Sequence, residues 1–300
     1  PIAAKLSELS RRPVKLVLSR EEVLQGGSGP PAGMHVTMDV AANADGKLQA
    51  IKGVYHVDTG GLPGMGPSLV MQAAGALYQT ETLHLEGYDV TTNKPRTEAY
   101  RGPGGIQAYF GMEQAMDMLC QELDMDPLEF RKRNASTTGS RRPIGTPFPS
   151  IGLTCILDHI GDHECWTDPL GEGEFPRGRG LAVGYWRGTS MTSACHISIV
   201  GDGRPMVTLG AVDLSGTRTT MAQVAAEQCG MSVDDVFVQM GDSKSVGYSD
   251  GAAGSRVART MTAAVVEASD DALAQLRQRA AAVLQANPDD LEYVMVVFYS

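Results

Sequence analysis

AYRGPGGIQAYFGMEQAMDML, residues 99–119, joins a glycine-rich turn to an amphipathic segment. Apolar side chains recur on one face of this segment and just beyond it, at Tyr109, Met112, Met116, Leu119 and Leu123. This spacing predicts a long helix that buries one face. The turn RGPGG at 101–105 lacks the lysine that a phosphate-binding loop carries. The helix is therefore expected to begin at a turn of a different kind.

Two further turns of the same character precede helical patterns, LSGTRTT at 214–220 and GAAGSR at 251–256. The first N–H groups of a helix lack internal partners and lie at the positive end of the helix dipole. Glycine lets a ligand approach the backbone, while serine, threonine and arginine add hydrogen-bond donors. The three turns thus suit an oxygen-rich anionic ligand, although helix capping alone is the common role of such residues.

Strands and helices alternate along the rest of the chain, which predicts an α/β fold with mixed sheets. The expected strands are 13–18, a hairpin over 34–60 with a tight primed turn at Asp45-Gly46, 180–188, a hairpin over 194–214 turning at Asp202-Gly203, and 236–240. The other expected helices are 2–9, a short one with a Ser19–Glu22 capping box, one starting at Asp126-Pro127, 151–164, and a cap at Asn287-Pro288.

A length of 300 residues with 42% hydrophobic content is enough for two domains. Residues 135–150 are rich in Ser, Thr, Gly and Pro and show no periodicity. We therefore expect a first domain over 1–140, a linker region over 141–180 and a second domain over 181–300.

Charge and cysteine content narrow the possible partners and setting. With 25 Lys and Arg against 35 Asp and Glu, the net charge of -10 opposes nucleic-acid binding. The five scattered cysteines form no CxxC pair, which favours a reducing, cytoplasmic setting. No apolar run reaches the ~18 residues of a membrane span. A helical start at Pro1 and an apolar, strand-like close at 294–300 suggest a fragment of a longer chain.

Familiar phosphate and nucleophile motifs are absent from the sequence. RGPGGIQ has Gln107 where GxGxxG needs its third glycine, and neither GxxxxGK[ST] nor GxSxG occurs. His159, His163 and Cys165 have a spacing that a metal ion can use on a helix, but a solvated helix end also accounts for them. FRKRN at 130–134 is expected to be the cationic last turn of a helix.

The stretch 98–135 resembles the molybdenum-cofactor-binding subunits of the xanthine dehydrogenase, aldehyde oxidase and carbon monoxide dehydrogenase family. The resemblance extends through RRPVKLVLSREE at 11–22, through 201–243 and through GAAGSRVARTMTAAVVEA at 251–268. It implies two α/β molybdopterin-binding domains, with a molybdopterin, often as its cytosine dinucleotide, between them.

The resemblance also assigns residues to cofactor binding: Tyr100, Arg101, Gly102, Ser215, Gly216, Thr217, Gly254, Ser255 and Arg256. The backbone of Arg101 is expected near the molybdenum ligands, and Gly254 near the metal and pterin. Ser215 departs from the glutamine of the family's GQG turn and has a shorter reach. No side chain is expected to ligate the metal, because the pterin holds it.

The implied reaction is hydroxylation of an organic substrate with oxygen derived from water. Electrons are expected to leave through 2Fe-2S clusters and an FAD on partner subunits or domains, so a hetero-oligomer is expected. The family's general-base glutamate near the carboxyl end has no match in the chain. The fragment alone is therefore expected to be inactive, and no catalytic residue is assigned.

Two positions narrow the range of possible substrates that the resemblance implies. Gly102 stands where carbon monoxide oxidisers have cysteine, and Pro103 where purine oxidisers have an aromatic residue. An N-heteroaromatic compound, an aldehyde or an aromatic thioester remain open. Pro103, Tyr185 and Trp186 are candidate pocket residues, with core packing as the alternative for the two aromatic residues. A nucleotide-dependent transferase and a non-catalytic binding module are the other classes considered.

Overall fold

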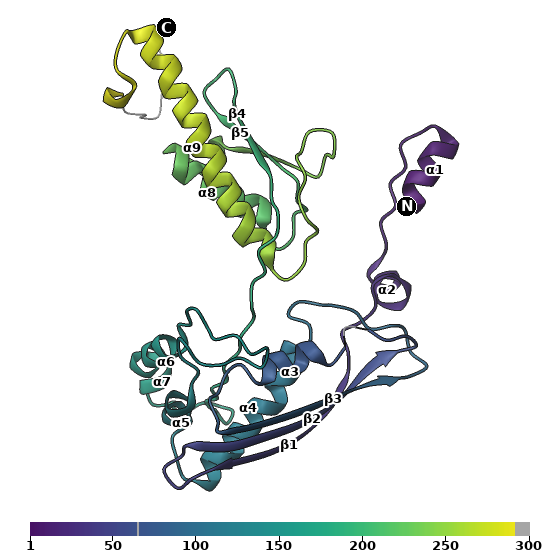
Figure 1. The fold of residues 1–300 in the computed structure, drawn as a ribbon, viewed down its shortest axis with the longest axis vertical. Helices are drawn as coiled ribbons and strands as arrows, with labels where there is room; N and C mark the ends of the chain where they lie inside the picture. Colours follow the sequence, from purple (N-terminus) through teal and green to yellow (C-terminus); the bar gives the residue numbers. More distant parts are fainter. Residues whose placement is uncertain (65, 292–300) are drawn as a thin grey trace. The chain divides into compact units, whose positions relative to one another are not determined.

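The computed structural model describes residues 1–64 and 66–291. The chain forms two compact units, Pro1–Trp186 and Arg187–Ser300. Each unit has a three-stranded sheet with helices packed on it (Figure 1). This arrangement confirms the predicted α/β class with mixed sheets. The apolar run expected at 294–300 lies outside the described residues.

The sheet of unit 1 combines both strand orientations. The predicted hairpin forms β1 (Met34–Ala42) and β2 (Leu48–Gly60), which are antiparallel. Helix α3 (Ser68–Ala74) then leads to β3 (Thr82–Thr91), which pairs with β2 in parallel. Sequence reasoning missed α3 and β3. Leu83, Leu85, Tyr88 and Val90 of β3 alternate with polar residues, a strand signal that was present in the sequence.

The predicted primed turn between β1 and β2 is wrong. A type I′ turn needs positive φ at both central residues. Here Gly46 has a positive φ of 74°, whereas the φ of Asp45 is not positive. The Asn43 side chain accepts a hydrogen bond from the Lys47 N–H at 2.8 Å, and the Asn43 N–H donates to the Lys47 carbonyl at 2.9 Å. The loop is therefore longer than a two-residue turn, because Asn43 closes it.

The predicted helices of unit 1 are confirmed, within a few residues at the ends. They are α1 (Ile2–Ser10), α2 (Arg20–Glu22), α4 (Gly105–Glu122), α5 (Pro127–Asn134) and α6 (Leu153–Asp162). A further short helix, α7 (Glu164–Thr167), follows α6. Ser19 and Glu22 form the expected capping box, followed by a π-helical turn over Val23–Gly27. Asp126 caps α5 with Pro127 at its first position. Helices α6 and α7 belong to the segment 141–180, which lies in unit 1.

The strands expected at 13–18 and 180–188 are wrong, since both segments are irregular. Leu16, Val17 and Leu18 are exposed and pair with no strand among the described residues. A short apolar run predicts burial or pairing only where a partner strand is available, which local sequence does not reveal.

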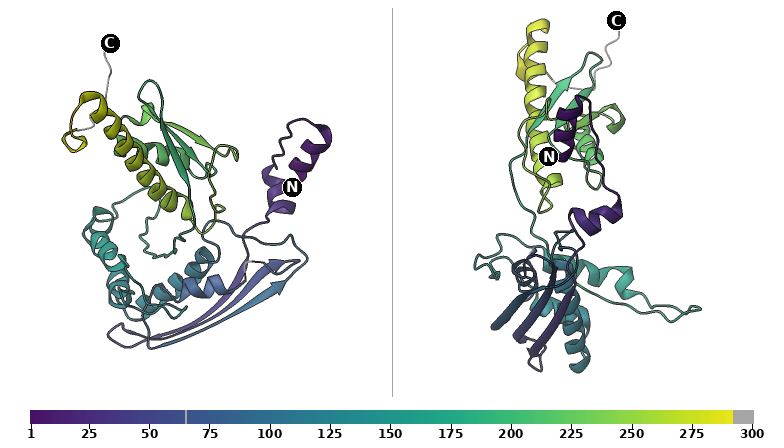
Figure 2. Two further views of the ribbon diagram at one scale, coloured as in Figure 1. Left: turned by 45° about the horizontal axis from the view of Figure 1, so that its top comes forward. Right: turned by 90° about the vertical axis from the view of Figure 1, so that its right-hand side faces the viewer.

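One face of the unit 1 sheet makes the core. Leu48, Ile51 and Tyr55 of β2 are buried against Met112 and Met116 of α4. Helices α3 and α4 lie on this face of the sheet (Figures 1 and 2). This packing anchors the turn that precedes α4.

Unit 2 repeats the order of elements seen in unit 1. The predicted hairpin forms β4 (Cys195–Ile199) and β5 (Pro205–Leu209), and α8 (Thr217–Cys229) leads to β6 (Phe237–Met240), parallel to β5. Helix α9 (Arg256–Leu284) then packs on β4, as α4 packs on β1. Short 3₁₀ turns cover Val233–Asp235 and Pro288–Asp290. Gly230 ends α8 in a left-handed conformation, and the expected Asn287 cap is confirmed.

This repetition places two of the predicted turns at equivalent positions. The turn before α4 follows β3, and the turn before α9 follows β6. In both units that third strand is parallel to the second arm of the hairpin.

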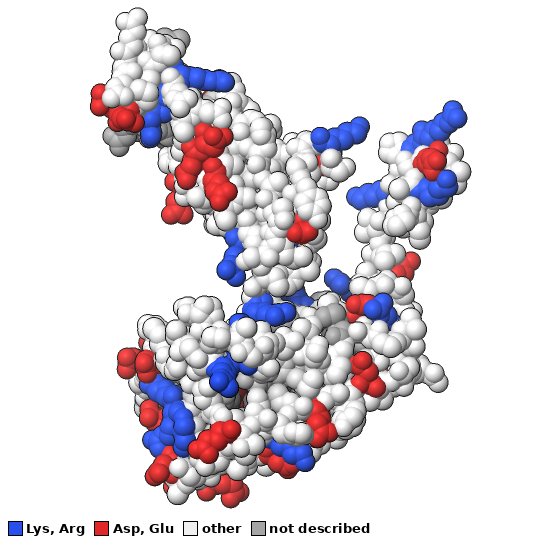
Figure 3. All heavy atoms as spheres, in the orientation of Figure 1, with Lys and Arg blue, Asp and Glu red and all other residues white. Residues whose placement is uncertain are grey.

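Acidic and basic side chains are interspersed on the face of the molecule in Figure 3.

Candidate functional site

Backbone conformation distinguishes the three predicted turns from other loops. Among residues 1–64 and 66–291, six residues other than glycine have a left-handed φ. Three of these lie at or just after helix C-termini, where the conformation is common: Arg11, Asp124 and Gln285. The others are Arg101, Ser215 and Ser255, one in each turn. Such conformations cost about 1–2 kcal/mol each and cluster at functional sites.

The turn before α4 needs two of its glycines. Arg101, Gly102 and Gly104 have φ of 33°, 72° and 78°. A Cβ added to Gly104 would lie 2.9 Å from both the backbone nitrogen and Cγ2 of Val70. Gly104 is the N-cap of α4 and offers no side-chain cap. The first turn of α4 therefore begins at backbone without a side-chain cap, held close to α3.

At the turn before α8, a carboxylate of the chain already accepts a hydrogen bond from the start of the helix. Ser215 and Gly216 have φ of 57° and 80°. The Arg218 N–H donates to Asp213 Oδ1 at 3.1 Å, and the Arg218 guanidinium lies 3.6 Å from the same carboxylate. Thr217 is buried, and its hydroxyl donates to a carbonyl of the turn at 2.7 Å. An anionic ligand at this turn would meet the charge of Asp213.

The turn before α9 packs against the start of unit 2. Gly254 and Ser255 have φ of 59° and 58°. The Thr189 N–H donates to the Gly254 carbonyl at 3.0 Å. A Cβ on Gly254 would lie 2.3 Å from Thr189 Oγ1, so only glycine fits without movement of Thr189.

The side chain of Arg256 contacts protein atoms. Its guanidinium is 1% exposed and donates to carbonyls of Gly251 at 2.8 Å and Thr192 at 3.3 Å. It also donates to the Asp250 carbonyl and, at 2.7 Å, to Ser193 Oγ. Arg256 thereby joins 192–193 to 250–251 and shapes the loop that carries Gly254.

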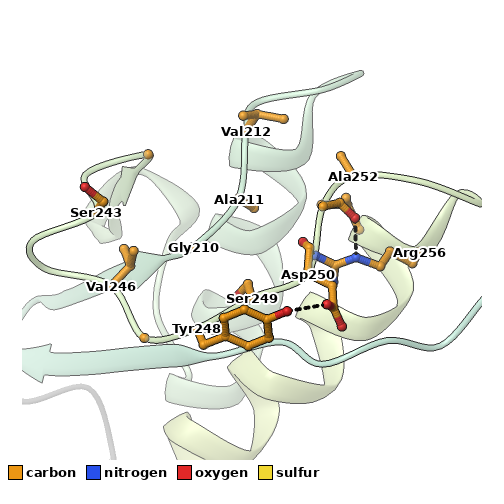
Figure 4. A pocket seen from close by; sticks show the side chains of 14 residues that line it. Gly210, Ala211, Val212, Ser243, Val246, Tyr248, Ser249, Asp250, Ala252 and Arg256 are labelled. Carbon is orange, nitrogen blue, oxygen red and sulfur yellow. Dashed lines mark hydrogen bonds between the residues drawn. The ribbon is translucent and has the colours of Figure 1, made fainter. Parts of the chain in front are cut away.

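A pocket of about 470 Å³ lies beside Arg256 (Figure 4). Its lining includes Gly210, Ala211, Val212, Ser243, Val246, Tyr248, Ser249, Asp250 and Ala252. It adjoins the carboxyl ends of β5 and β6, where open α/β sheets commonly bind ligands. The Tyr248 hydroxyl donates to Asp250 Oδ1 at 2.7 Å, and the Thr192 N–H donates to Oδ2 at 2.8 Å. These hydrogen bonds lower the pKa of Asp250, so the pocket wall carries a negative charge.

This shift predicts an acid-sensitive loop. A carboxyl group whose pKa is lowered by folding stabilises the fold above its unfolded pKa, near 4, and loses that effect as the pH falls below it. We expect the thermal unfolding temperature to fall less between neutral pH and about pH 3 in Asp250→Asn than in the wild type. Circular dichroism of both chains measures this, and an identical acid dependence would contradict it.

Trp186 lies against the first turn, within unit 1. Cβ atoms added to Gly102 and Gly105 would lie 3.8 and 3.6 Å from Cε3 of the Trp186 ring. The indole nitrogen Nε1 is buried and has no hydrogen-bond partner among the described residues. Tyr185 packs edge-on against the buried ring of Phe148, with centroids 5.3 Å apart. The structure thus brings Trp186 to the Arg101–Gly104 turn and directs the ring of Tyr185 to the core.

The remaining candidates do not converge on a metal site. His163 Nδ1 accepts the Cys165 N–H at 3.1 Å as the cap of α7, while His159 lies in the last turn of α6. In the part of the chain that the structure describes, no three His, Cys, Asp or Glu residues are grouped to hold a metal ion. No helix within these residues has the length and apolar character needed to cross a membrane.

Comparison with known families identifies the chain. The molybdopterin cofactor-binding domain family matches residues 1–135 and, through a second domain model of the same description, 164–300. The chain belongs to the molybdenum-cofactor-binding subunits of the xanthine dehydrogenase and aldehyde oxidase family. This chain resembles several relatives over nearly all of its 300 residues.

The aldehyde oxidoreductase molybdenum-binding subunit PaoC of Escherichia coli is 27% identical over 298 residues, which covers 97% of this chain and 40% of PaoC. The carbon monoxide dehydrogenase large chain of Afipia carboxidovorans is 27% identical over 316 residues, covering 94% of this chain and 39% of that one. Quinoline 2-oxidoreductase from Pseudomonas putida 86 shares the fold, with a TM-score of 0.77 at 22% identity, over 97% of this chain and 40% of its own. The chain therefore spans about 40% of the length of the curated relatives it matches.

Sequence reasoning missed several residues that shape the site. Thr189 and Asp250 hold the turn before α9, and no motif marks either of them. Glu113 did leave a signal, because it lies beside Met112 on the buried face of an amphipathic helix. A charge on that face predicts a buried partner, which is Arg131. The expected cationic last turn over 130–134 is confirmed, and within it Arg131 is fully buried.

Proposed function

We propose that this chain is the cofactor-binding part of a molybdenum hydroxylase that oxidises an organic substrate with oxygen from water. The observation that carries the proposal is the backbone of the three turns. In a chain of this family, Arg101, Ser215 and Ser255 each take up a left-handed conformation at the start of a helix whose N-cap residue makes no side-chain capping hydrogen bond. Strain of this kind is kept where a function requires the geometry.

The residues present fit a molybdopterin. The start of α4, which has no side-chain cap, and a buried indole N–H without a partner among the described residues supply donors, and a pterin bearing a phosphate supplies acceptors. The residues proposed to hold it are Tyr100, Arg101, Gly102, Ser215, Gly216, Thr217, Gly254, Ser255 and Arg256, the last through the shape of its loop. When bound, the cofactor supplies the oxidation of a substrate carbon. The chain itself binds and orients, through backbone N–H groups.

The substrate proposed is an N-heteroaromatic compound or an aldehyde. Gly102 gives no thiol beside the cofactor turn, and Pro103 provides no ring on which a purine could stack. Trp186 beside Gly105 offers an apolar, aromatic wall to a planar compound. The cofactor is proposed to be the cytosine dinucleotide form.

Partner polypeptides complete the proposal. Subunits or domains with 2Fe-2S clusters and FAD would accept the electrons in a hetero-oligomer, and a cytoplasmic setting remains the prediction. The chain spans about 40% of its relatives, so the remaining polypeptide is proposed to supply the general-base glutamate. We expect the purified 300-residue chain to show no turnover with an artificial electron acceptor. Turnover would contradict this part of the proposal.

The main test uses the intact enzyme that contains this chain. Elemental analysis is expected to find stoichiometric molybdenum, and acid denaturation is expected to release a pterin together with cytidine monophosphate. With labelled water, an N-heteroaromatic compound or an aldehyde is expected to gain the label. The control is a known molybdenum enzyme produced in the same cells. If that control contains molybdenum and the complex with this chain does not, the nucleotide-binding or non-catalytic alternative is favoured.

A further inference from the structure

Helix α4 holds the segment 183–186 at two points one helical turn apart. The Tyr109 hydroxyl donates to the Tyr185 carbonyl. Glu113 Oε2 accepts the Val183 N–H at 3.0 Å. Residues four apart share one face of a helix, so both contacts bind the segment to the same side of α4.

Glu113 is itself immobilised. Its carboxylate accepts Arg131 Nε at 2.9 Å and the Tyr78 hydroxyl at 2.7 Å. The side chains of Arg131 and Glu113 are 0% and 6% exposed. Burial and the charge of Glu113 raise the pKa of Tyr78, which therefore stays a donor. With Val183 as a third donor, the carboxylate has its orientation set by three different parts of unit 1.

Ring packing continues this attachment to the start of α4. Cβ atoms added to Gly105 and Gly184 would each lie 3.5 Å from the Tyr109 ring, so this ring lies against both glycines. The Trp186 ring then lies over Gly102 and Gly105. One helix therefore carries the Arg101–Gly104 turn at its start and the anchors of Trp186 along its first three turns.

We propose that Tyr109 and Glu113 are positioning residues, which fix Trp186 as a wall of the ligand site at the Arg101–Gly104 turn. The ligand at this wall is a planar aromatic substrate. Its role in turnover rests on the proposed function, whereas the positioning itself is a property of the chain without cofactor. The Arg101–Gly104 turn leads into α4, and the segment that carries Trp186 is hydrogen-bonded to α4. The turn and Trp186 are therefore expected to keep their spacing when neighbouring loops move.

Hydrogen exchange in the full chain tests the positioning. Tyr109→Phe removes one hydrogen bond and keeps the ring. We expect amide exchange in residues 183–186 to become about 3- to 10-fold faster, the equivalent of one lost hydrogen bond. Tyr88→Phe is the matched control, since the exposed Tyr88 hydroxyl bonds only Glu86 on β3 in the described structure. Unchanged exchange in Tyr109→Phe, or an equal rise in Tyr88→Phe, would overturn the proposal.

A second measurement uses the fluorescence of the 300-residue chain. In a Trp166→Phe background, Trp186 is the remaining tryptophan of this chain, and acrylamide is expected to quench it more strongly after Tyr109→Phe. In the intact enzyme with an aromatic substrate, Tyr109→Phe is expected to raise KM several-fold while molybdenum content stays unchanged. A lowered kcat with unchanged KM and quenching would contradict positioning. Absence of molybdenum from the wild-type enzyme would refute the proposed function and leave the exchange result standing.

Discussion

Glu113→Ala is expected to lower the free energy of unfolding of unit 1 by about 3–5 kcal/mol, because it leaves a buried arginine without its main partner. Arg131 is 0% exposed and, among the described residues, retains only Asp117 Oδ1, at 2.8 Å, as an ion-pair partner. Tyr78 and Val183 lose their acceptor in the same step. Both tryptophans, Trp166 and Trp186, lie in unit 1, so tryptophan fluorescence during urea unfolding reports on this unit.

Two variants serve as controls for this loss. Asp117→Ala removes the partly exposed partner of Arg131 and is expected to change stability by about 1 kcal/mol or less. Glu113→Gln keeps an acceptor for the Val183 N–H. Its loss of unfolding free energy is expected to lie between those of Glu113→Ala and Asp117→Ala. If Glu113→Ala lies within about 0.5 kcal/mol of the wild type, as neutral surface changes do, the buried network does not support unit 1.

Gly104→Ala is expected to destabilise unit 1 by about 2–3 kcal/mol, from a left-handed alanine and a backbone clash. Its φ is 78°, and the added Cβ would meet the backbone nitrogen of Val70 at 2.9 Å. Because α4 begins at this residue, molybdenum content of the intact enzyme is expected to fall as well. Urea unfolding and elemental analysis measure the two effects.

The neighbouring glycine is the matched control. At Gly105 no left-handed φ applies, and an added Cβ meets side-chain atoms of Tyr109 and Trp186 at 3.5–3.9 Å, ordinary contact distances. Gly105→Ala is therefore expected to be neutral or to stabilise the helix by up to about 1 kcal/mol. Equal losses in the two variants would show that the turn does not depend on the conformation of Gly104.

Local patterns predicted most elements of both units. The apolar face of α4, the Asp126-Pro127 start of α5 and the glycine after α8 each act over a few residues, so they are legible in the chain. The errors at 13–18 and 180–188 have one cause, since an apolar run becomes a strand only if another strand pairs with it. The edge strand β3 was missed although Leu83 and Leu85 alternate with polar residues, whereas its parallel pairing with β2 is decided only in the fold.

The features of the candidate site also divide into those set by local sequence and those set by tertiary contacts. By itself, the sequence determined the three turns and their opening of helices, because glycine, serine and capping preferences are local properties of the backbone. Only the tertiary structure decided that Trp186 lies on the first turn, that Asp213 already faces the second, and that Arg256 serves the loop of the third. Each of these depends on contacts between residues far apart in the chain or on side-chain direction. Burial and hydrogen bonding set such contacts only once the units have folded.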